Sequence, residues 1–333
     1  MGHNRRSLLQ MGGLAAAMLP AGGAPAATGA PASVGSHTAI PRLTVATIMN
    51  GGAPSLGVRT AKGVLDVGAA EKVLRRGLPT TVDGLIQGRG DRAALQRLIA
   101  SPPASVRFIP EAEVRFGPCV TAPEKIVCMG LNYRAHLAEI GQAAPAAPSL
   151  FNKFNTSLNG HKGTVDVSCQ TKGSHFDYEA ELVIVMGREA TGVPEADALN
   201  YVFGYCVGND FTARDLQYAS TQWMSGKAGD GFGPIGPWLV SADQVDPDNL
   251  DIKCEVNGQL RQSSNTKLMI YSCRKMIAYM SACFTLKPGD VIFTGTPEGV
   301  IHGYPKEKQV WLKKGDRVVT SIQHLGDLEF TLV

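Results

Sequence analysis

The sequence predicts a strand-rich α+β fold, with a small N-terminal α+β unit and a larger domain built mainly from strands. Three observations support this prediction. Short apolar runs rich in β-branched residues recur along the chain, Gly and Pro separate them, and helical periods are short. The strands are spaced irregularly, which argues against a doubly wound sheet, where strands and helices alternate.

The small unit is predicted over residues 41–122. Residues 43–67 contain three short β-type runs separated by turns, and residues 81–99 have the apolar spacing of a helix. The remaining residues, 123–333, would form the larger domain. A chain of this length can bury a large core together with a smaller unit.

The larger domain is predicted to contain eight strands and one clear helix. The helix covers residues 272–284. The strands are expected at 125–129, 179–186, 201–209, 237–240, 252–256, 291–294, 317–322 and 327–332. We find no internal repeat and no glycine loop of the kind that binds phosphate.

The N-terminus has the pattern of an export signal. Asn4-Arg-Arg-Ser-Leu-Leu9 is a twin-arginine motif, a short apolar run follows, and Ala24-Pro-Ala26 resembles a cleavage site. We expect a twin-arginine signal peptide over 1–26, a linker over 27–40 and a periplasmic mature protein. A disordered start without export is the alternative, and cleavage after Ala27 or Ala32 would also fit the pattern.

Charge and cysteine content exclude several classes of protein. The formal charge is +3, and removal of the predicted leader lowers it to +1 because Arg5 and Arg6 are lost. A nearly neutral body gives no reason to expect a nucleic acid or a membrane surface as partner. The seven cysteines contain no Cys-x-x-Cys pair, which argues against a zinc ribbon or a redox motif. Most of them lie in apolar surroundings, as small core residues do.

A group of acidic residues indicates a metal site. Glu179 and Glu181 lie two residues apart on a predicted strand, so they share one face, and Asp210 follows another apolar run. Two carboxylates on a strand that enters a core repel each other unless a cation binds. Three carboxylate ligands favour Mg²⁺ or Mn²⁺ over zinc. Asp177 lies on the same face, and a solvent-facing strand end remains the alternative to a metal site.

A histidine and a glutamate form a second candidate group. His136 and Glu139 are three residues apart, so they can touch if residues 132–140 form a short helix. A carboxylate beside an imidazole raises its basicity and fixes its tautomer, which suits the activation of a water molecule. From spacing alone, an exposed histidine on a surface turn is the alternative.

An ordered series of motifs resembles the fumarylacetoacetate hydrolase family, in particular its shorter members, which include acylpyruvases and 2-hydroxyhepta-2,4-diene-1,7-dioate isomerases. The resemblance covers about residues 41–333 and is strongest after Lys125. The motifs are Gly130-Leu-Asn-Tyr-Arg-Ala-His-Leu-Ala-Glu139, Phe151-Asn-Lys153, Asp177-Tyr-Glu-Ala-Glu-Leu182, Asn209-Asp-Phe-Thr-Ala-Arg-Asp215, Gly226-Lys227, Gly233-Pro-Ile-Gly-Pro-Trp238 and Thr294-Gly-Thr-Pro297.

The resemblance implies a mixed β-sandwich roll for the larger domain and assigns roles to the candidate residues. It implies that Glu179, Glu181 and Asp210 bind the metal and that His136 with Glu139 activates water. The other assignments are Lys227 as stabiliser of oxyanion charge, Arg214 and Gln217 as pocket residues, Thr296 as carboxylate binder, and Lys153 as a further substrate-binding candidate. We also expect a homodimer.

The predicted function is a metal-dependent hydrolase that cleaves a carbon–carbon bond in acylpyruvate-like acids. Isomerisation, hydration or decarboxylation of 2-oxo acids could use the same metal site, and a non-catalytic periplasmic dicarboxylate-binding protein is a further alternative. The sequence departs from the family pattern at two places near the expected substrate. Ala228-Gly229 replaces the usual Ser-Phe, and Ile301-His302 interrupts a glycine-rich stretch.

Overall fold

The computed structural model describes residues 41–168 and 173–333. Residues Ile40–Val333 form one compact unit. The predicted signal peptide (1–26), the predicted linker (27–40) and Cys169 lie outside the described residues. Within the described part of the chain, no helix has both the length and the apolar composition that a membrane span requires.

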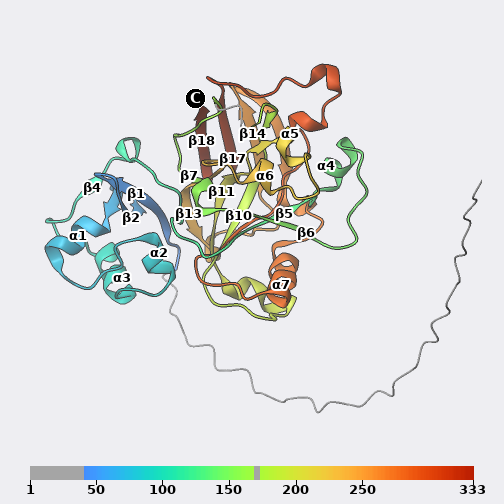
Figure 1. Ribbon diagram of the computed structural model, residues 1–333. Coiled ribbons are helices and arrows are strands. Elements are labelled where there is room, and N and C mark those ends of the chain that lie inside the picture. Colours follow the sequence, from blue (N-terminus) through green and yellow to red (C-terminus); the bar gives the residue numbers. More distant parts are fainter. Residues whose placement is uncertain (1–40, 169–172) are drawn as a thin grey trace, which may run out of the picture. The chain divides into compact units, whose positions relative to one another are not determined.

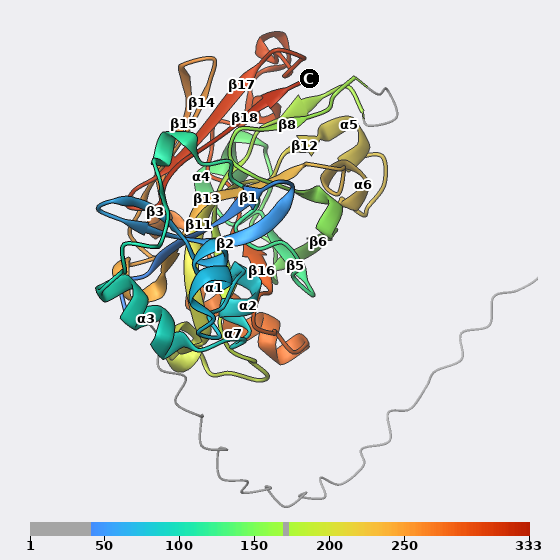
Figure 2. The same ribbon diagram turned by 90° about the vertical axis from the view of Figure 1, so that its left-hand side faces the viewer.

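The N-terminal part is a four-stranded antiparallel sheet with three helices beside it (Figure 2). The strands are β1 (Thr44–Asn50), β2 (Ala53–Thr60), β3 (Gly63–Asp66) and β4 (Phe108–Ile109), and the helices are α1 (Val67–Leu74), α2 (Val82–Ile86) and α3 (Arg92–Ala100). Leu56 and Leu65 of the sheet share a core with Leu85 and Leu95 of the helices. The boundary predicted after residue 122 stays a prediction.

The helix predicted over 81–99 is interrupted. Gly88 and Gly90 have φ values of +73° and +87°, a left-handed conformation that ends α2 and that residues other than glycine rarely adopt. Asp91 then caps the first turn of α3 with its side chain. Helix α1 was not predicted. It begins where the Asp66 side chain accepts a hydrogen bond from the backbone of the first turn.

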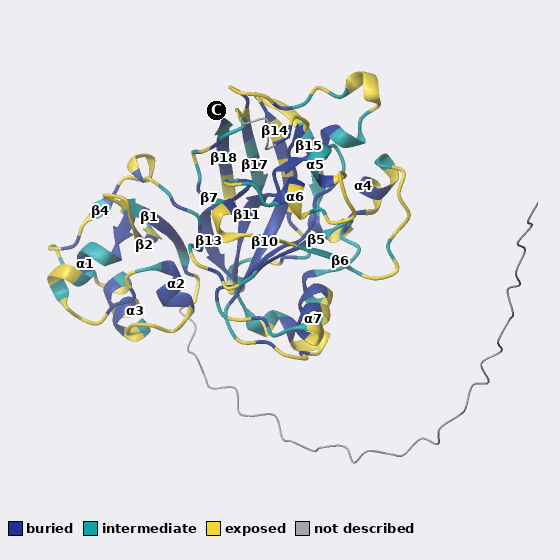
Figure 3. Ribbon diagram, viewed as in Figure 1, coloured by how far each residue is buried: buried dark blue, intermediate teal, exposed yellow. Residues whose placement is uncertain are grey.

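The larger part continues the same sheet, because β1 pairs with β13. The order of the main path is β4-β3-β2-β1-β13-β11-β10-β16-β5-β6, and β7 pairs with β13 (Figure 1). The additional strands are β5 (Ile126–Gly130), β6 (Ser149–Lys153), β7 (Leu158–Asn159), β10 (Ala180–Met186), β11 (Val202–Asn209), β13 (Gly233–Ser241) and β16 (Val291–Phe293). Every residue of β10 and β13 is buried (Figure 3), as expected for strands covered on both faces.

A second sheet packs against this one. Its order is β15-β14-β17-β18-β8, and β14, β17 and β18 contact β10, β11 and β13. The bounds are β8 (Gly163–Val165), β14 (Asp251–Val256), β15 (Gln259–Asn265), β17 (Arg317–Ile322) and β18 (Gly326–Leu332). Buried and more exposed residues alternate along β14 and β17, which places one face of this sheet on the core.

Shorter elements complete the fold. They are the strand pair β9 (Phe176–Asp177) with β12 (Thr212–Ala213), and helices α4 (Arg134–Glu139), α5 (Arg214–Gln217), α6 (Met224–Lys227) and α7 (Cys273–Cys283). The eight strands and the helix predicted for this part are present, with bounds that differ by a few residues. The strand-rich α+β prediction with mixed, packed sheets is therefore confirmed. Among the described cysteines, Cys283 is exposed, the others are buried, and all are free.

Candidate functional site

Three carboxylates come together where β10 and β11 pair. Glu181 lies on β10, Glu179 directly precedes this strand, and Asp210 directly follows β11. The antiparallel register sets Glu181 opposite Gly208, which brings Asp210 beside the two glutamates. One oxygen of each carboxylate lies within 4.8 Å of the others, and all three residues are buried. The structure thus brings the three predicted metal ligands into one cluster.

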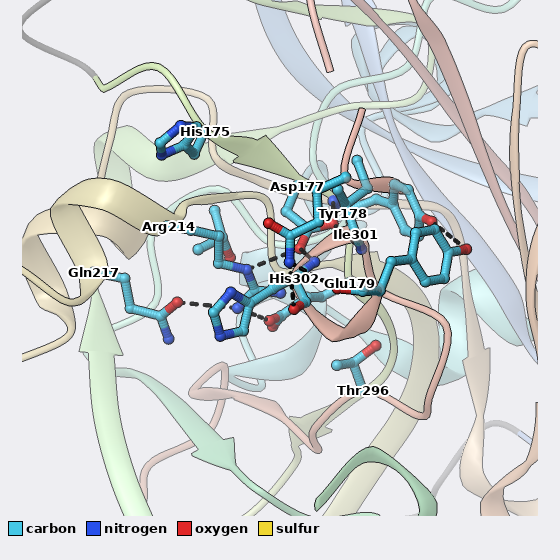
Figure 4. Close-up of polar contacts among 12 residues, drawn as sticks. His175, Asp177, Tyr178, Glu179, Arg214, Gln217, Thr296, Ile301 and His302 are labelled. Atoms are coloured by element: carbon cyan, nitrogen blue, oxygen red, sulfur yellow. Dashed lines mark hydrogen bonds and ion pairs between the residues drawn. The ribbon is translucent and has the colours of Figure 1, made fainter. Parts of the chain in front are cut away.

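Asp177, which the sequence could not separate from this group, lies apart from it. The chain leaves strand conformation between β9 and β10, so the alternation of side chains does not continue through residue 178. The Asp177 carboxylate accepts hydrogen bonds from the backbone amides of Ile301 and His302, at 2.9 and 3.0 Å, and from Nε of Arg214 at 2.9 Å (Figure 4). Asp177 therefore fixes Arg214 in place.

The cluster fits a metal site. Burial raises the pKa of Glu181, and the neighbouring charges of Asp210 and Glu179 raise it further. A divalent cation would relieve this repulsion, since three carboxylates in a low-dielectric surrounding cannot all stay ionised cheaply without positive charge. Carboxylate oxygens are also the ligands that Mg²⁺ and Mn²⁺ prefer.

Basic side chains neutralise part of this charge. Nζ of Lys227 lies 2.6 Å from Oε2 of Glu179 and 2.8 Å from Oδ2 of Asp210. Nη1 of Arg214 lies 2.7 Å from Oε1 of Glu179. Burial alone would raise the pKa of Glu179, but Lys227 and Arg214 hold it below its ordinary value. Burial alone would lower the pKa of Lys227, but Asp210 and Glu179 raise it, so the ammonium stays charged.

Lys227 reaches the cluster because two short helices approach closely. Lys227 ends α6, and the preceding Gly226 packs against the backbone of α5. A Cβ atom at Gly226 would lie 2.3 Å from the backbone nitrogen of Gln217 and 2.4 Å from the carbonyl oxygen of Ala213. Only glycine permits this approach, since such distances are far inside van der Waals contact.

His136 and Glu139 form the predicted pair on α4. Nδ1 of His136 lies 2.8 Å from Oε1 of Glu139. The second carboxylate oxygen of Glu139, Oε2, accepts a hydrogen bond from the backbone amide of Gly299 at 2.9 Å. His136 is buried, with 5% of its surface exposed, which excludes the alternative of an exposed surface histidine. Because Nδ1 faces the carboxylate, Nε2 is the nitrogen left for other partners.

One pocket, partly open to solvent, gathers most of the candidate residues. Its walls include Glu179, Glu181, Asp210, His136, Lys227, Arg214, Gln217 and Thr296. Lys153 lies behind the acids. Its Nζ is 2.5 Å from Oδ1 of Asp210 and donates to the backbone carbonyls of Phe232 and Lys227. In this structure Lys153 therefore supports a candidate metal ligand and does not line the pocket.

The pocket also contains residues that the sequence analysis did not single out. They are Met129, Gly130, Leu131, Phe151, Tyr218 and Trp223. Phe151 and Trp223 meet edge to face, with ring centroids 5.6 Å apart, and form an apolar wall. Phe151 opens one of the motifs that carry the family resemblance, which is the signal that could have identified it. Trp223 lies between two of these motifs and has no such signal.

The chain belongs to the fumarylacetoacetate hydrolase family. Residues 125–333 match the family model for the fumarylacetoacetate hydrolase C-terminal domain. A Burkholderia multivorans protein with the provisional name of a hydrolase is 42% identical over 268 residues, which cover 80% of this chain and 92% of that protein. The chain is therefore an enzyme of this family, and hydrolase is the name its relatives carry.

Solved structures of similar proteins include enzymes of two kinds. Maleylpyruvate hydrolase from Sphingobium sp. SYK-6, solved with manganese(II) and pyruvate, is 31% identical and has a TM-score of 0.68, with 87% of this chain and 98% of that chain covered. The 5-carboxymethyl-2-hydroxymuconate delta-isomerase from Mycobacterium smegmatis is 30% identical and has a TM-score of 0.66, with the same coverage. The alternative of a non-catalytic binding protein finds no support among these relatives.

Proposed function

We propose that this protein is a divalent-metal-dependent hydrolase that cleaves a carbon–carbon bond in β-diketo acids of the acylpyruvate type. The observation that carries the proposal is the His136–Glu139 pair in the same pocket as the acid cluster. A metal ion held by Glu179, Glu181 and Asp210 would act as a Lewis acid toward the oxygens of the substrate. Mg²⁺ and Mn²⁺ are the ions proposed, and the manganese in the similar maleylpyruvate hydrolase structure supports this choice.

Two residues of α4 would carry out the proton transfer. Glu139 accepts the Nδ1 proton of His136, so Nε2 carries the lone pair and can take a proton from water. The resulting hydroxide adds to the distal carbonyl carbon of the substrate. The carbon–carbon bond then breaks, its electron pair stays on the pyruvate fragment as an enolate, and the acyl fragment leaves as a carboxylic acid.

Other residues of the pocket would bind the substrate and stabilise the charge that develops on it. Lys227 carries a buried positive charge beside the acids and would stabilise the enolate oxygen. The hydroxyl oxygen of Thr296 accepts a hydrogen bond from Nε2 of Gln262 at 2.8 Å, which leaves its proton free to donate to a substrate carboxylate. Arg214 and Gln217 would complete the binding wall.

A reaction other than hydrolysis is the second candidate. The isomerase among the similar structures favours it, together with the position of Lys227 beside two of the three acids. Isomerisation, hydration or decarboxylation of 2-oxo acids would use the same cluster. Decarboxylation needs electron withdrawal from the breaking bond but no general base.

Two variants distinguish hydrolysis from decarboxylation. His136→Ala in a hydrolase should lower turnover of an acylpyruvate roughly 10²–10⁴-fold, the range for a positioned general base. Pyruvate should still bind, since the acid cluster is unchanged. In a decarboxylase, His136→Ala should barely slow CO₂ release from oxaloacetate, whereas Lys227→Ala should slow it. Full cleavage of the acylpyruvate by His136→Ala would refute the assigned role of His136.

The cellular setting is part of the proposal. We propose that the enzyme is exported by the twin-arginine route and acts in the periplasm as a homodimer. Its partner would be a small oxo-acid substrate. The arginine pair and the cleavage pattern at residues 24–26 support the export route.

A further inference from the structure

The segment where this chain departs from the family's glycine-rich pattern lies at the edge of the pocket. Residues Ile301–Gly303 form a 3₁₀ turn. The backbone amides of Ile301 and His302 hold Asp177, which in turn holds Arg214 (Figure 4). The turn is therefore fixed to the pocket by its backbone, and the His302 side chain is left for another contact.

That contact is a stacked pair of rings. The imidazole of His302 stacks on the ring of Tyr218, with centroids 5.0 Å apart and an interplanar angle of 29°. Tyr218 directly follows α5 and lines the pocket, whereas His302 does not. Tyr218 is 42% exposed, so its ring would be free to turn without this neighbour. His302 therefore packs against the Tyr218 ring from outside the pocket and limits its rotation.

The pocket wall formed by Tyr218 and α5 contains hydrogen-bond donors that have no acceptor among the described residues. Nη2 of Arg214 is buried and has no hydrogen-bond partner among the described residues. Oε1 of Gln217 accepts from Nη1 of Arg214 at 3.0 Å, which turns the amide and leaves its NH₂ group unused. Tyr218 is exposed, and its hydroxyl makes no hydrogen bond to the described residues, so it is also available as a donor. An unpaired buried donor such as Nη2 of Arg214 is costly, so this wall is suited to a ligand that brings acceptor oxygens.

We propose that Tyr218 binds the end of the substrate that lies away from the acid cluster, that His302 positions Tyr218, and that this wall selects 2-oxo acids with a second carboxylate over those with an alkyl end. The inference rests on the proposed function for the placement of the 2-oxo-acid end at the acids. Tyr218 is far more exposed than the three buried acids of the same pocket, so it lies nearer the pocket mouth, where the far end of a bound 2-oxo acid would be.

Ligand binding tests this without turnover. The purified full chain, with Mg²⁺ or Mn²⁺, is titrated calorimetrically with pyruvate, 2-oxohexanoate and 2-oxohexanedioate. The parent should bind 2-oxohexanedioate more tightly than 2-oxohexanoate. Tyr218→Phe should lose roughly tenfold in affinity for 2-oxohexanedioate, the effect of one hydrogen bond to a charged group, and keep its affinity for pyruvate.

Variants of His302 test the positioning role. His302→Ala should weaken 2-oxohexanedioate binding and spare pyruvate, and His302→Phe should restore the affinity because it restores a stacked ring. His175 provides the matched control, since its imidazole also lies against an aromatic ring, that of Trp311, with centroids 4.8 Å apart. His175→Ala removes an equivalent contact outside the pocket lining and should leave all three affinities unchanged.

Three results would overturn the proposal. The first is a parent that binds 2-oxohexanedioate no more tightly than 2-oxohexanoate, which includes a parent that binds none of the three ligands. The second is an equal loss of affinity for pyruvate and 2-oxohexanedioate in Tyr218→Phe. The third is an unchanged affinity for 2-oxohexanedioate in His302→Ala. Failure of the proposed function has a different signature, because an enzyme that cleaves no acylpyruvate could still show the predicted order of affinities.

Discussion

Replacement of Glu139 by glutamine should inactivate the enzyme by reversing the tautomer of His136. Oε2 of Glu139 accepts from the Gly299 amide at 2.9 Å, and Oε1 faces Nδ1 of His136 at 2.8 Å. In Glu139→Gln, the amide oxygen must stay at the Gly299 N–H, because an NH₂ group there would oppose a donor with a donor. The NH₂ group then points at Nδ1.

The consequence follows from the two ring nitrogens. Nδ1 would have to accept the hydrogen bond, so the proton moves to Nε2, and Nε2 can no longer take a proton from water. The expected loss in kcat is that of a general base, roughly 10²–10⁴-fold. The shape of the side chain is preserved, so thermal stability and pyruvate affinity should stay close to those of the parent.

The assay is the initial rate of acylpyruvate cleavage with Mg²⁺ or Mn²⁺ at saturating substrate. Glu139→Ala is the comparison variant, since it removes the carboxylate but leaves His136 free to adopt either tautomer. Glu139→Gln should therefore be at least as slow as Glu139→Ala. A glutamine variant with the parent's kcat would refute the tautomer argument.

Three further predictions concern other parts of the chain. Gly303→Ala would place a Cβ atom 2.4 Å from Cδ of Glu139, so the carboxylate should be displaced and kcat should fall while affinity for Mg²⁺, measured by calorimetry, stays unchanged; unchanged kcat would show that Glu139 can move without loss. Glu181→Ala should weaken divalent-ion binding and remove the Mg²⁺ dependence of the melting temperature, because a ligand of the folded state stabilises by mass action; Mg²⁺ binding as tight as the parent's would exclude Glu181 as a ligand. Arg5→Lys with Arg6→Lys should keep the protein in the cytoplasm with its leader uncleaved, as judged by fractionation, and normal periplasmic delivery would contradict the export assignment.

The sequence predicted the parts of the fold that depend on local pattern. The strands that became β10, β11, β14, β17 and β18 carry apolar or alternating runs, and such runs specify a strand and its buried face without knowledge of its neighbours. Helix α1 has no such independent signal, since it continues directly from β3 and is defined by the Asp66 cap. To predict the break between α2 and α3, the left-handed conformation of Gly88 and Gly90 would have had to count for more than the helical spacing of the apolar residues.

The candidate site shows the same division. Spacing could place Glu179 and Glu181 together, but it could not exclude Asp177, because that decision depends on a backbone break at residue 178. The approach of Lys227 depends on contact between α5 and α6 at Gly226, which no local pattern encodes. The motif resemblance supplied these assignments, whereas the role of Lys153 behind the acids required the three-dimensional contacts.

The charges around the pocket predict that binding of an anionic substrate depends on the metal. The buried ionic groups at the site comprise more acids than bases: Asp177, Glu179, Glu181 and Asp210 against Lys153, Arg214 and Lys227. With all of them ionised the group is negative, and protonation of Glu181, whose pKa burial and the neighbouring acids raise, makes it neutral; in neither state does the group attract an anionic 2-oxo acid. A divalent cation makes the group positive. The bases are too few to attract the substrate themselves, yet they keep Glu179 ionised and ready to bind the ion. A cation bound to the three acids would therefore also make the field that the substrate meets positive.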